Sequence, residues 1–268
     1  MEKVCWNLTN RCNEECSFCF RELFETPRSF EDNLIILDNL YKMGVKHITF
    51  AGGEPLLYQD LVDLMVRSKE LGMKVSLITN GSRLNENNIE DILKYVDRIT
   101  FSIDSSLPFR NKIIGRGEGH YEHIKSILPF IREKFPDIII EINSVVFKEN
   151  ISEIEILYES IVEDFLPYGL QKWKISRFCP LRGKAKEREK QFSVSDQEFN
   201  TIKEYFELEN DFFPISIRDT EDVNSNVIVS PSGNLKVSFA NNEETVFYDL
   251  SSVTPMEMQK VLTKGDNK

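Results

Sequence analysis

The sequence lacks long apolar runs and is poor in positive charge. No stretch of its 268 residues approaches the ~20 apolar residues that a membrane-spanning helix needs, so we expect no membrane span. The 33 lysines and arginines are outnumbered by 44 aspartates and glutamates, which gives a formal net charge of −11. General nucleic-acid binders usually present a basic face, and this composition argues against that class.

The first ten residues, MEKVCWNLTN, lack the basic start and apolar core of a secretion signal. We therefore expect a cytoplasmic protein whose thiols stay reduced. In that setting, clustered cysteines bind metals more often than they pair as disulfides.

The strongest local concentration of positive charge is RGKAKEREK, at 182–190. Such a run is typical of a solvated loop and the start of a helix. It could also form a local pocket for one small anion. Both interpretations stay open from the sequence.

Short runs rich in β-branched residues alternate with amphipathic segments over the first 180 residues. The predicted strands are 3–9, 47–51, 74–79, 98–103, 138–146 and 172–178. The predicted helices are 29–44, 60–72, 88–96, 121–135 and 151–166. This alternation predicts parallel strands joined by right-handed crossovers. Six such units are fewer than the eight of a closed barrel, so the sequence predicts an α/β fold with a partial, open β/α barrel of six parallel strands.

The pattern changes after residue 191. A capped helix is predicted over 193–207, a β-hairpin with a Pro-Ser-Gly-Asn turn over 226–239, and a short helix within 256–268. We therefore expect residues 1–191 to form the barrel domain and residues 192–268 to form a small C-terminal extension packed on it.

Three of the five cysteines lie close together in RCNEECSFCF, where Cys12, Cys16 and Cys19 follow the spacing C-x3-C-x2-C. They come directly after the first predicted strand, and chemistry in such folds gathers at the carboxyl ends of the strands. Thiolates suit zinc and iron–sulfur clusters, and a structural zinc site needs four ligands. Three ligands leave one position open for chemistry. Cys5 and Cys179 could approach, but each is better explained as a buried apolar residue.

This cysteine motif, with Phe18 before its last cysteine, resembles the signature of radical S-adenosylmethionine enzymes. Other stretches agree in order: AGGEP (51–55), LITNG (77–81), FSIDS (101–105), IGRGEG (114–119) and INSVV (142–146). The resemblance covers roughly residues 4–180.

The resemblance implies a [4Fe–4S] cluster on Cys12, Cys16 and Cys19, with S-adenosylmethionine on the fourth iron. An external one-electron donor of the flavodoxin or ferredoxin type would reduce the cluster. Reductive cleavage would then give a 5′-deoxyadenosyl radical that abstracts hydrogen from a substrate.

The resemblance also implies which residues bind the cofactor. Gly52 and Gly53 lack a Cβ, so their backbone can approach a ligand closely. Glu54 offers an acceptor for the cofactor's ammonium group, and Pro55 fixes the turn. Without the other motifs, this stretch would be a tight turn after a strand.

Ser102 and Asp104 alternate on a strand and point to one side, where they reach the cofactor's ribose or amino group or cap the strand end. Arg116 suits the methionine carboxylate, with an exposed loop arginine as the alternative. Asn143 places an amide in an apolar strand, and a buried amide needs a partner such as a ribose hydroxyl.

Aromatic residues on either side would flank the adenine. The resemblance assigns this place to the Phe18 backbone and to Phe178, although Phe178 could be plain core. For the histidines, no carboxylates are arranged around His120 and His123, and we expect these two to lie on a solvated helix face.

The stretches ITFAGGEP, IGRGEG, WKISRF and FSVSDQEF resemble the viperin-like branch, which dehydrates nucleoside triphosphates. Lysines that hold the triphosphate in that branch would align with His47 and Glu141. A carboxylate at Glu141 would repel a polyphosphate. A basic segment could compensate, formed by Arg177, Arg182, Lys184 and Lys186.

The sequence leaves two alternatives to a small-molecule, possibly nucleotide-like substrate. One is a maturase of ribosomally made peptides, although such enzymes often carry extra clusters and no cysteine follows Cys179. The other is a non-catalytic iron–sulfur or zinc module. The GGEP stretch and the carboxylates at strand ends count against the module.

Overall fold

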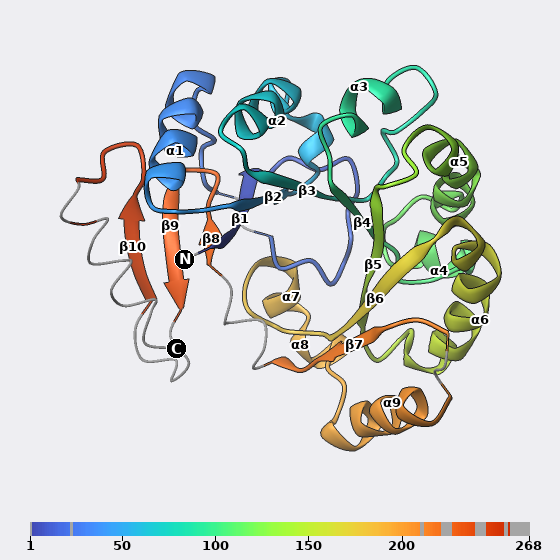
Figure 1. The fold of residues 1–268 in the computed structure, drawn as a ribbon. Helices are drawn as coiled ribbons and strands as arrows, with labels where there is room; N and C mark the ends of the chain where they lie inside the picture. The colour runs from blue at the N-terminus through green and yellow to red at the C-terminus, as the bar shows by residue number, and fades with distance from the viewer. Residues whose placement is uncertain are drawn as a thin grey trace.

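The computed structural model describes residues 2–21, 24–209, 212–220, 227–238, 245–254 and 257. Its central sheet has ten strands in the order β10-β9-β8-β1-β2-β3-β4-β5-β6-β7 (Figure 1). Seven strands run parallel through its middle and far edge: β1 (Lys3–Thr9), β2 (His47–Gly52), β3 (Lys74–Thr79), β4 (Arg98–Ser102), β5 (Ile139–Val146), β6 (Leu170–Arg177) and β7 (Ile215–Arg218). The sheet is curved and does not close, which confirms the predicted open β/α barrel.

Helices follow the strands as the sequence pattern predicts. The predicted set is α1 (Phe30–Lys42), α2 (Leu61–Glu70), α3 (Ile89–Leu93), α5 (His120–Lys134) and α6 (Ile154–Asp164). These helices line the outer side of the curved sheet (Figure 1). Ser29 caps α1 by accepting a hydrogen bond from the backbone N–H of Asp32. No helix among the described residues has both the length and the apolar character needed to cross a membrane.

Several short elements have no counterpart in the prediction, because they are too short to show a clear hydrophobic period. They are η1 (Pro55–Leu57), α4 (Pro108–Ile113) and η3 (Leu166–Tyr168). The helix start that one interpretation placed in the basic run 182–190 is present as α7 (Gly183–Glu187), followed by α8 (Glu189–Phe192). A further turn, η2 (Ile151–Glu153), forms the start of the segment predicted as one helix through α6.

The C-terminal part extends the sheet at both of its edges. After α9 (Asp196–Glu209), strand β7 pairs with β6, while β8 (Ile228–Val229) pairs with β1 in parallel. The predicted hairpin is present as β8 and β9 (Asn234–Ser238), and β10 (Thr245–Asp249) continues it in antiparallel fashion. These strands supply partners for backbone groups that six strands alone would leave open. The terminal helix predicted within 256–268 lies outside the described residues, apart from residue 257.

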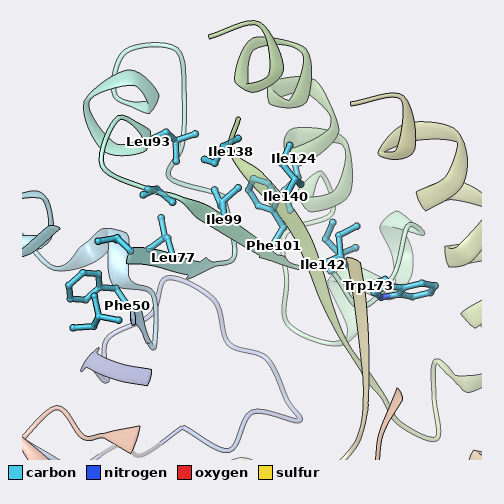
Figure 2. Close-up of a cluster of buried hydrophobic side chains, with 14 of the residues drawn as sticks. Phe50, Leu77, Leu93, Ile99, Phe101, Ile124, Ile138, Ile140, Ile142 and Trp173 are labelled. Carbon is cyan, nitrogen blue, oxygen red and sulfur yellow. The ribbon is translucent and has the colours of Figure 1, made fainter. Parts of the chain in front are cut away.

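Alternation along the strands divides the sheet into two faces. On the outer face, Phe50, Leu77, Phe101, Ile142 and Trp173 are fully buried against the helices (Figure 2). The residues between them point to the concave face, which is polar. The carboxyl ends of the strands meet at one rim of that face, and this rim carries the cysteine loop.

Candidate active site

The cysteine loop leaves β1 and is fastened to two neighbouring loops by backbone contacts. The N–H of Gly53 donates to Thr9 O at 2.6 Å, and a Cβ on Gly53 would collide with the backbone of Arg11. On the other side, Ser17 N–H donates to Ile114 O at 2.9 Å. Gly115, at a φ of +86°, leaves no room for a Cβ against the backbone of Glu15. The GGEP and IGRGEG stretches therefore cradle the cysteines.

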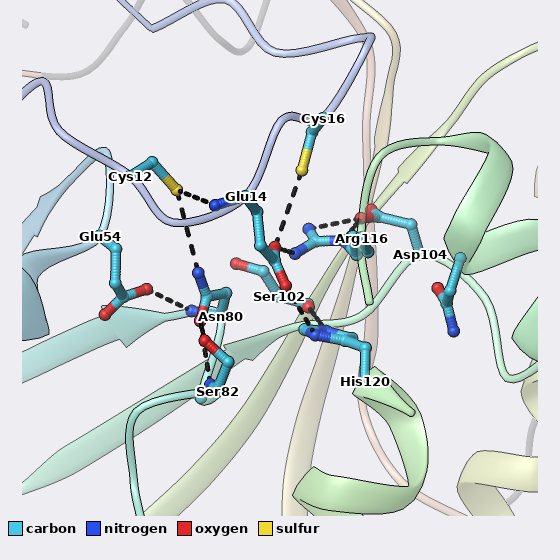
Figure 3. Close-up of polar contacts among 12 residues, drawn as sticks. Cys12, Glu14, Cys16, Glu54, Asn80, Ser82, Ser102, Asp104, Arg116 and His120 are labelled. Carbon is cyan, nitrogen blue, oxygen red and sulfur yellow. Dashed lines mark hydrogen bonds and ion pairs between the residues drawn. The ribbon is translucent and has the colours of Figure 1, made fainter. Parts of the chain in front are cut away.

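A buried charged network lies directly beneath the cysteines (Figure 3). Arg116 donates to Asp104 Oδ2 from Nε at 2.8 Å and from Nη2 at 2.6 Å. Its Nη1 lies 2.5 Å from Glu14 Oε2, and His120 Nδ1 lies 3.0 Å from Glu14 Oε1. Burial raises the pKa of Glu14, but His120 and Arg116 outweigh it and hold that pKa below its usual range. Glu14 is thus an ionised carboxylate between two cysteines.

Arg116 is not the exposed loop arginine that the sequence allowed as an alternative, and Asp104 makes contacts at the strand ends, as the capping alternative allowed. Both side chains are buried, and Asp104 Oδ1 also accepts the backbone N–H of Val145 at 2.8 Å. All three guanidinium nitrogens of Arg116 face protein carboxylates. These two residues therefore join the ends of β4 and β5 to the cysteine loop.

Glu54 is fully buried and joins the GGEP turn to the end of β3. Its Oε1 accepts Thr79 Oγ1 at 2.7 Å and Leu56 N–H at 3.1 Å, and its Oε2 accepts Asn80 N–H at 2.8 Å. Burial raises the pKa of this carboxyl even though these hydrogen bonds oppose the shift. Pro55 begins η1 directly after Glu54. The Asn80 side chain reaches the cysteine loop, with Nδ2 3.1 Å from Asn13 Oδ1 and 3.9 Å from Cys12 Sγ.

Ser102 and Asn143 lie side by side in the register of β4 and β5, both on the concave face. The Oδ1 atom of Asn143 is buried and has no hydrogen-bond partner among the described residues. A buried amide oxygen without a donor is unusual in a folded protein. It marks a place where a ligand hydroxyl or amine fits.

Phe18 and Phe178 belong to a small apolar cluster beside the cysteines. Phe18 stacks on Phe147 with ring centroids 4.8 Å apart, and Phe178 packs against Phe192 at 5.8 Å. Both phenylalanines are buried, and Cys16 packs against the same cluster. The cluster supplies an apolar wall next to the thiols.

Two of the cysteine thiols, those of Cys12 and Cys16, favour the protonated form in the absence of a metal. Burial raises the pKa of Cys16 to about 12 and also raises that of Cys12. Metal binding releases these protons. Among the described residues, no three His, Cys, Asp or Glu side chains converge tightly enough to hold a single metal ion. Three half-buried thiols on a glycine-cradled loop fit a larger cluster better than one zinc ion.

The histidine prediction was wrong for His120, which is buried rather than solvated. It sits at the start of α5 with Nε2 2.9 Å from Ser102 O, so it bridges β4 and the Glu14 carboxylate. His123 contacts Gly81 O and Leu84 O instead. The i, i+3 spacing placed the two rings one turn apart but could not show which of them faces the sheet.

The concave face below the rim is basic, which the sequence motifs did not reveal. Glu141 is the only acidic residue that the described strands β1 to β7 place on it. Its carboxylate pairs with Lys174 and lies 3.4 Å from Arg98 Nε. Burial lowers the pKa of Lys174, Glu141 opposes this, and Arg218 and Arg98 lower it further. The alternation of side chains along the strands could have predicted this basic face, because Lys174, Arg98 and Arg218 each occupy a strand position that points to the concave side.

The basic segment 177–186 lies elsewhere. Arg177 contacts Asp196 at 2.7 Å and Asp219 at 3.3 Å, and Lys184 contacts Glu15 at 2.5 Å. Lys186 pairs with Glu189 at 2.8 Å. The sequence suggested that this segment could offset the negative charge of Glu141. In the structure, Lys174 and Arg98 neutralise Glu141 directly instead.

Comparisons with known proteins agree with this geometry. The model of the Radical SAM superfamily matches residues 6–161. An S-adenosylmethionine-dependent nucleotide dehydratase of Flammeovirga pacifica is 30% identical over 96% of this chain and 88% of its own length. A protein of the same description from Danio rerio is 29% identical over 75% of this chain, which spans 58% of that relative.

Solved structures share the fold at low identity. Streptococcus suis SuiB bound to S-adenosylmethionine has a TM-score of 0.70 at 14% identity, covering 96% of this chain and 65% of that one. The structure of anSMEcpe with bound AdoMet gives 0.69 at 15% identity, covering 96% and 79%. Enzymes of this superfamily use a [4Fe–4S] cluster and S-adenosylmethionine. With its family match, its cysteine loop and its open barrel, the chain belongs to the radical S-adenosylmethionine superfamily of enzymes.

Proposed function

We propose that this enzyme acts on a nucleoside triphosphate and dehydrates it. The relatives named S-adenosylmethionine-dependent nucleotide dehydratases support the substrate class. The observation that carries the proposal is the basic concave face, because it lies beneath the cysteine loop in a protein whose net charge is −11. An anionic substrate fits that face.

The cations follow the strands down from the rim. Lys174 stands level with Asn143, and Lys172 stands level with Glu141, one step lower. Arg98 lies four residues before Ser102 on β4, about 13 Å further down the sheet. A nucleotide bound on the concave face below Asn143 would run its phosphates past these groups. Lysine and arginine are the usual partners of phosphate oxygens.

The sequence suggested that Glu141 would repel a polyphosphate. Its pairing with Lys174 and Arg98 offsets that repulsion, since the cluster as a whole carries more positive than negative charge. Arg218 lies close enough to Lys174 to lower its pKa and adds to the positive field.

We infer that Cys12, Cys16 and Cys19 would hold the iron–sulfur cluster, which together with S-adenosylmethionine would supply the chemistry of hydrogen-atom abstraction from a substrate. The residues that hold the cofactor would be Phe18, Gly52, Gly53, Glu54, Pro55, Ser102, Asp104, Arg116, Asn143 and Phe178. Asn143 has the clearest role, because its Oδ1, which has no hydrogen-bond partner in the described part of the chain, would accept a ribose hydroxyl. Asp104 and Arg116 would act through the network that positions the cysteine loop.

A peptide substrate is the second candidate. A solved structure of SuiB is bound to its precursor peptide SuiA, and this chain shares its fold with a TM-score of 0.71. At 15% identity, that likeness concerns the fold alone. The basic face requires an anion, which a nucleotide supplies more directly than a general peptide.

The test is anaerobic reconstitution of the cluster, followed by incubation with reductant, S-adenosylmethionine and each nucleoside triphosphate in turn. We expect one nucleotide to stimulate 5′-deoxyadenosine formation and to yield a product lacking one water. Lys174→Gln should raise KM for that nucleotide by roughly tenfold or more, the value of one charge-assisted hydrogen bond. Lys42→Gln, an exposed cation at the end of α1, is the matched control. Indifference to every nucleotide would move the substrate assignment to peptides or other metabolites.

A further inference from the structure

The basic run at 182–190 packs against the outer side of the cysteine loop. The backbone N–H of Ala185 donates to Cys19 O at 3.2 Å, and Arg182 Nε donates to Phe20 O at 3.0 Å. Lys184 adds an ion pair of 2.5 Å to Glu15. The start of α7 is therefore one hydrogen bond away from a residue that supplies a cluster thiolate.

This surface differs in charge from the rest of the protein. Residues 182–190 contain five cations and two acids, a net of +3 in a chain of net −11. Lys186, Arg188 and Lys190 are exposed. Beside Arg182, Phe20 and Leu181 leave 37% and 40% of their surface open to solvent. Exposed apolar side chains in the same surface as exposed charged ones are compatible with protein docking.

We propose that this surface, formed by Phe20, Leu181 and residues 182–190, docks an acidic protein that delivers electrons to the cluster. The proposal rests on the superfamily chemistry and not on the substrate. One electron passes from the reduced carrier, of flavodoxin or ferredoxin type, to the oxidised cluster. The carrier is thereby oxidised by one electron and the cluster reduced by one, with no bond made or broken.

The positive charge of this surface favours an acidic partner. The patch attracts an acidic protein and repels a basic one, while the acidic remainder of the surface disfavours every other orientation of the acidic partner. The contacts of Ala185 and Arg182 then bring the docked partner against the loop that carries Cys19.

The experiment compares two double variants of the reconstituted enzyme. Lys186→Glu with Arg188→Glu reverses two charges on the proposed surface. The matched control is Lys42→Glu with Lys46→Glu, at and after the end of α1, where Lys46 pairs with Glu2 much as Lys186 pairs with Glu189. Iron content is measured first, so that only loaded proteins are compared.

Cluster reduction is then followed by its visible absorbance, without substrate, using either a reduced acidic flavodoxin or dithionite. For the surface variant, we expect reduction by flavodoxin to slow by roughly tenfold at low salt, with the difference shrinking at high salt. Dithionite, a small reductant, should reduce both variants equally.

Equal flavodoxin rates for both double variants would overturn the proposal. It would also be overturned if the surface variant were slowed as much with dithionite, because the effect would then lie in the cluster itself. Because substrate is absent, neither outcome bears on the proposed nucleotide.

Discussion

Arg116 Nη1 lies 2.5 Å from Glu14 Oε2, and this buried ion pair connects the middle of the cysteine loop to the segment after α4 (Figure 3). Both side chains are only 6% exposed. The same guanidinium holds Asp104 at the end of β4. The loop that would bind the cluster is therefore positioned by charge as well as by backbone contacts.

Replacing Glu14 tests this positioning. Glu14→Gln keeps the shape but removes one carboxylate from a buried network. Breaking a buried pair in this way should lower the free energy of unfolding of the metal-free protein by about 3 kcal/mol. We also expect less iron per chain after reconstitution. Glu15→Gln, the exposed neighbour, should change neither quantity. Unaltered stability in Glu14→Gln would show that the network does not hold the loop.

We expect the cysteines of the loop to be cluster ligands and Cys179 not to be one. Cys16→Ala should abolish the visible absorbance of the cluster and all cleavage of S-adenosylmethionine. Cys179→Ala should leave both intact, since Cys179 is a buried residue outside the loop. Loss of the cluster in Cys179→Ala would instead indicate a fourth ligand and no open iron.

Gly53 is where close approach of the backbone matters most. In Gly53→Ala the new methyl group would overlap the backbone of Arg11, so the loop must shift. We expect a clear loss of iron binding. Gly117→Ala is the control, because a Cβ there meets nothing within 4 Å. If both variants load iron normally, the cradle is not needed for the cluster.

Two substitutions on the concave face should change the affinity for a nucleoside triphosphate in opposite directions. Glu141→Gln removes the acid from a cluster of cations, so it should tighten binding of a nucleoside triphosphate. Lys174→Gln should weaken it, since each charge-assisted contact contributes about 1.5–3 kcal/mol. Calorimetry on the reconstituted enzyme measures both. Changes in the same direction for the two variants would contradict phosphate binding at this face.

His47 provides a spectroscopic reporter at the lower end of the face. Burial lowers its pKa, and Arg98, Lys3 and Lys74 lower it further, against an opposing effect of Asp97. The pKa of His47 is therefore lower in the folded protein than its usual value of 6.5. Its neutral form contributes to the free energy of unfolding above pH 6.5, and this contribution is lost as the pH falls below that value. Bound tripolyphosphate should raise the pKa, because negative charge favours the imidazolium. An NMR titration of the ring, with its signal assigned by His47→Gln, measures the shift. A titration that tripolyphosphate leaves unchanged would place the phosphates elsewhere.

Much of the barrel could be predicted because the hydrophobic periodicity of this sequence agrees with its helix caps and turn residues. β1 and β3 begin and end where the β-branched runs do, and α1 begins after Ser29 as its cap predicts. The edge strands β7 and β10 could not be foreseen, because their pairing depends on contacts with distant segments. The domain boundary near residue 191 and the cytoplasmic location stay predictions.

In the candidate site, too, some features could be predicted from the sequence, while others depend on contacts between distant segments. The spacing predicts Cys12, Cys16 and Cys19 as ligands, which stays a prediction, but it gave no sign that Glu14 would meet Arg116, 102 residues away. The partners of Arg116 depend on how two loops meet at the rim. Likewise, the residue type of Glu141 alone predicts repulsion of a polyphosphate. Only the arrangement of the neighbouring strands shows that Lys174 and Arg98 neutralise its charge.

The most direct test of the account follows one hydrogen atom. The reconstituted enzyme is incubated with S-adenosylmethionine, reductant and a nucleoside triphosphate deuterated throughout its ribose, and the 5′-deoxyadenosine formed is analysed by mass spectrometry. We predict that deuterium appears in 5′-deoxyadenosine together with a dehydrated nucleotide. If 5′-deoxyadenosine forms without deuterium from any nucleotide, while the cluster is intact and reduced, the nucleotide is not the molecule from which hydrogen is taken.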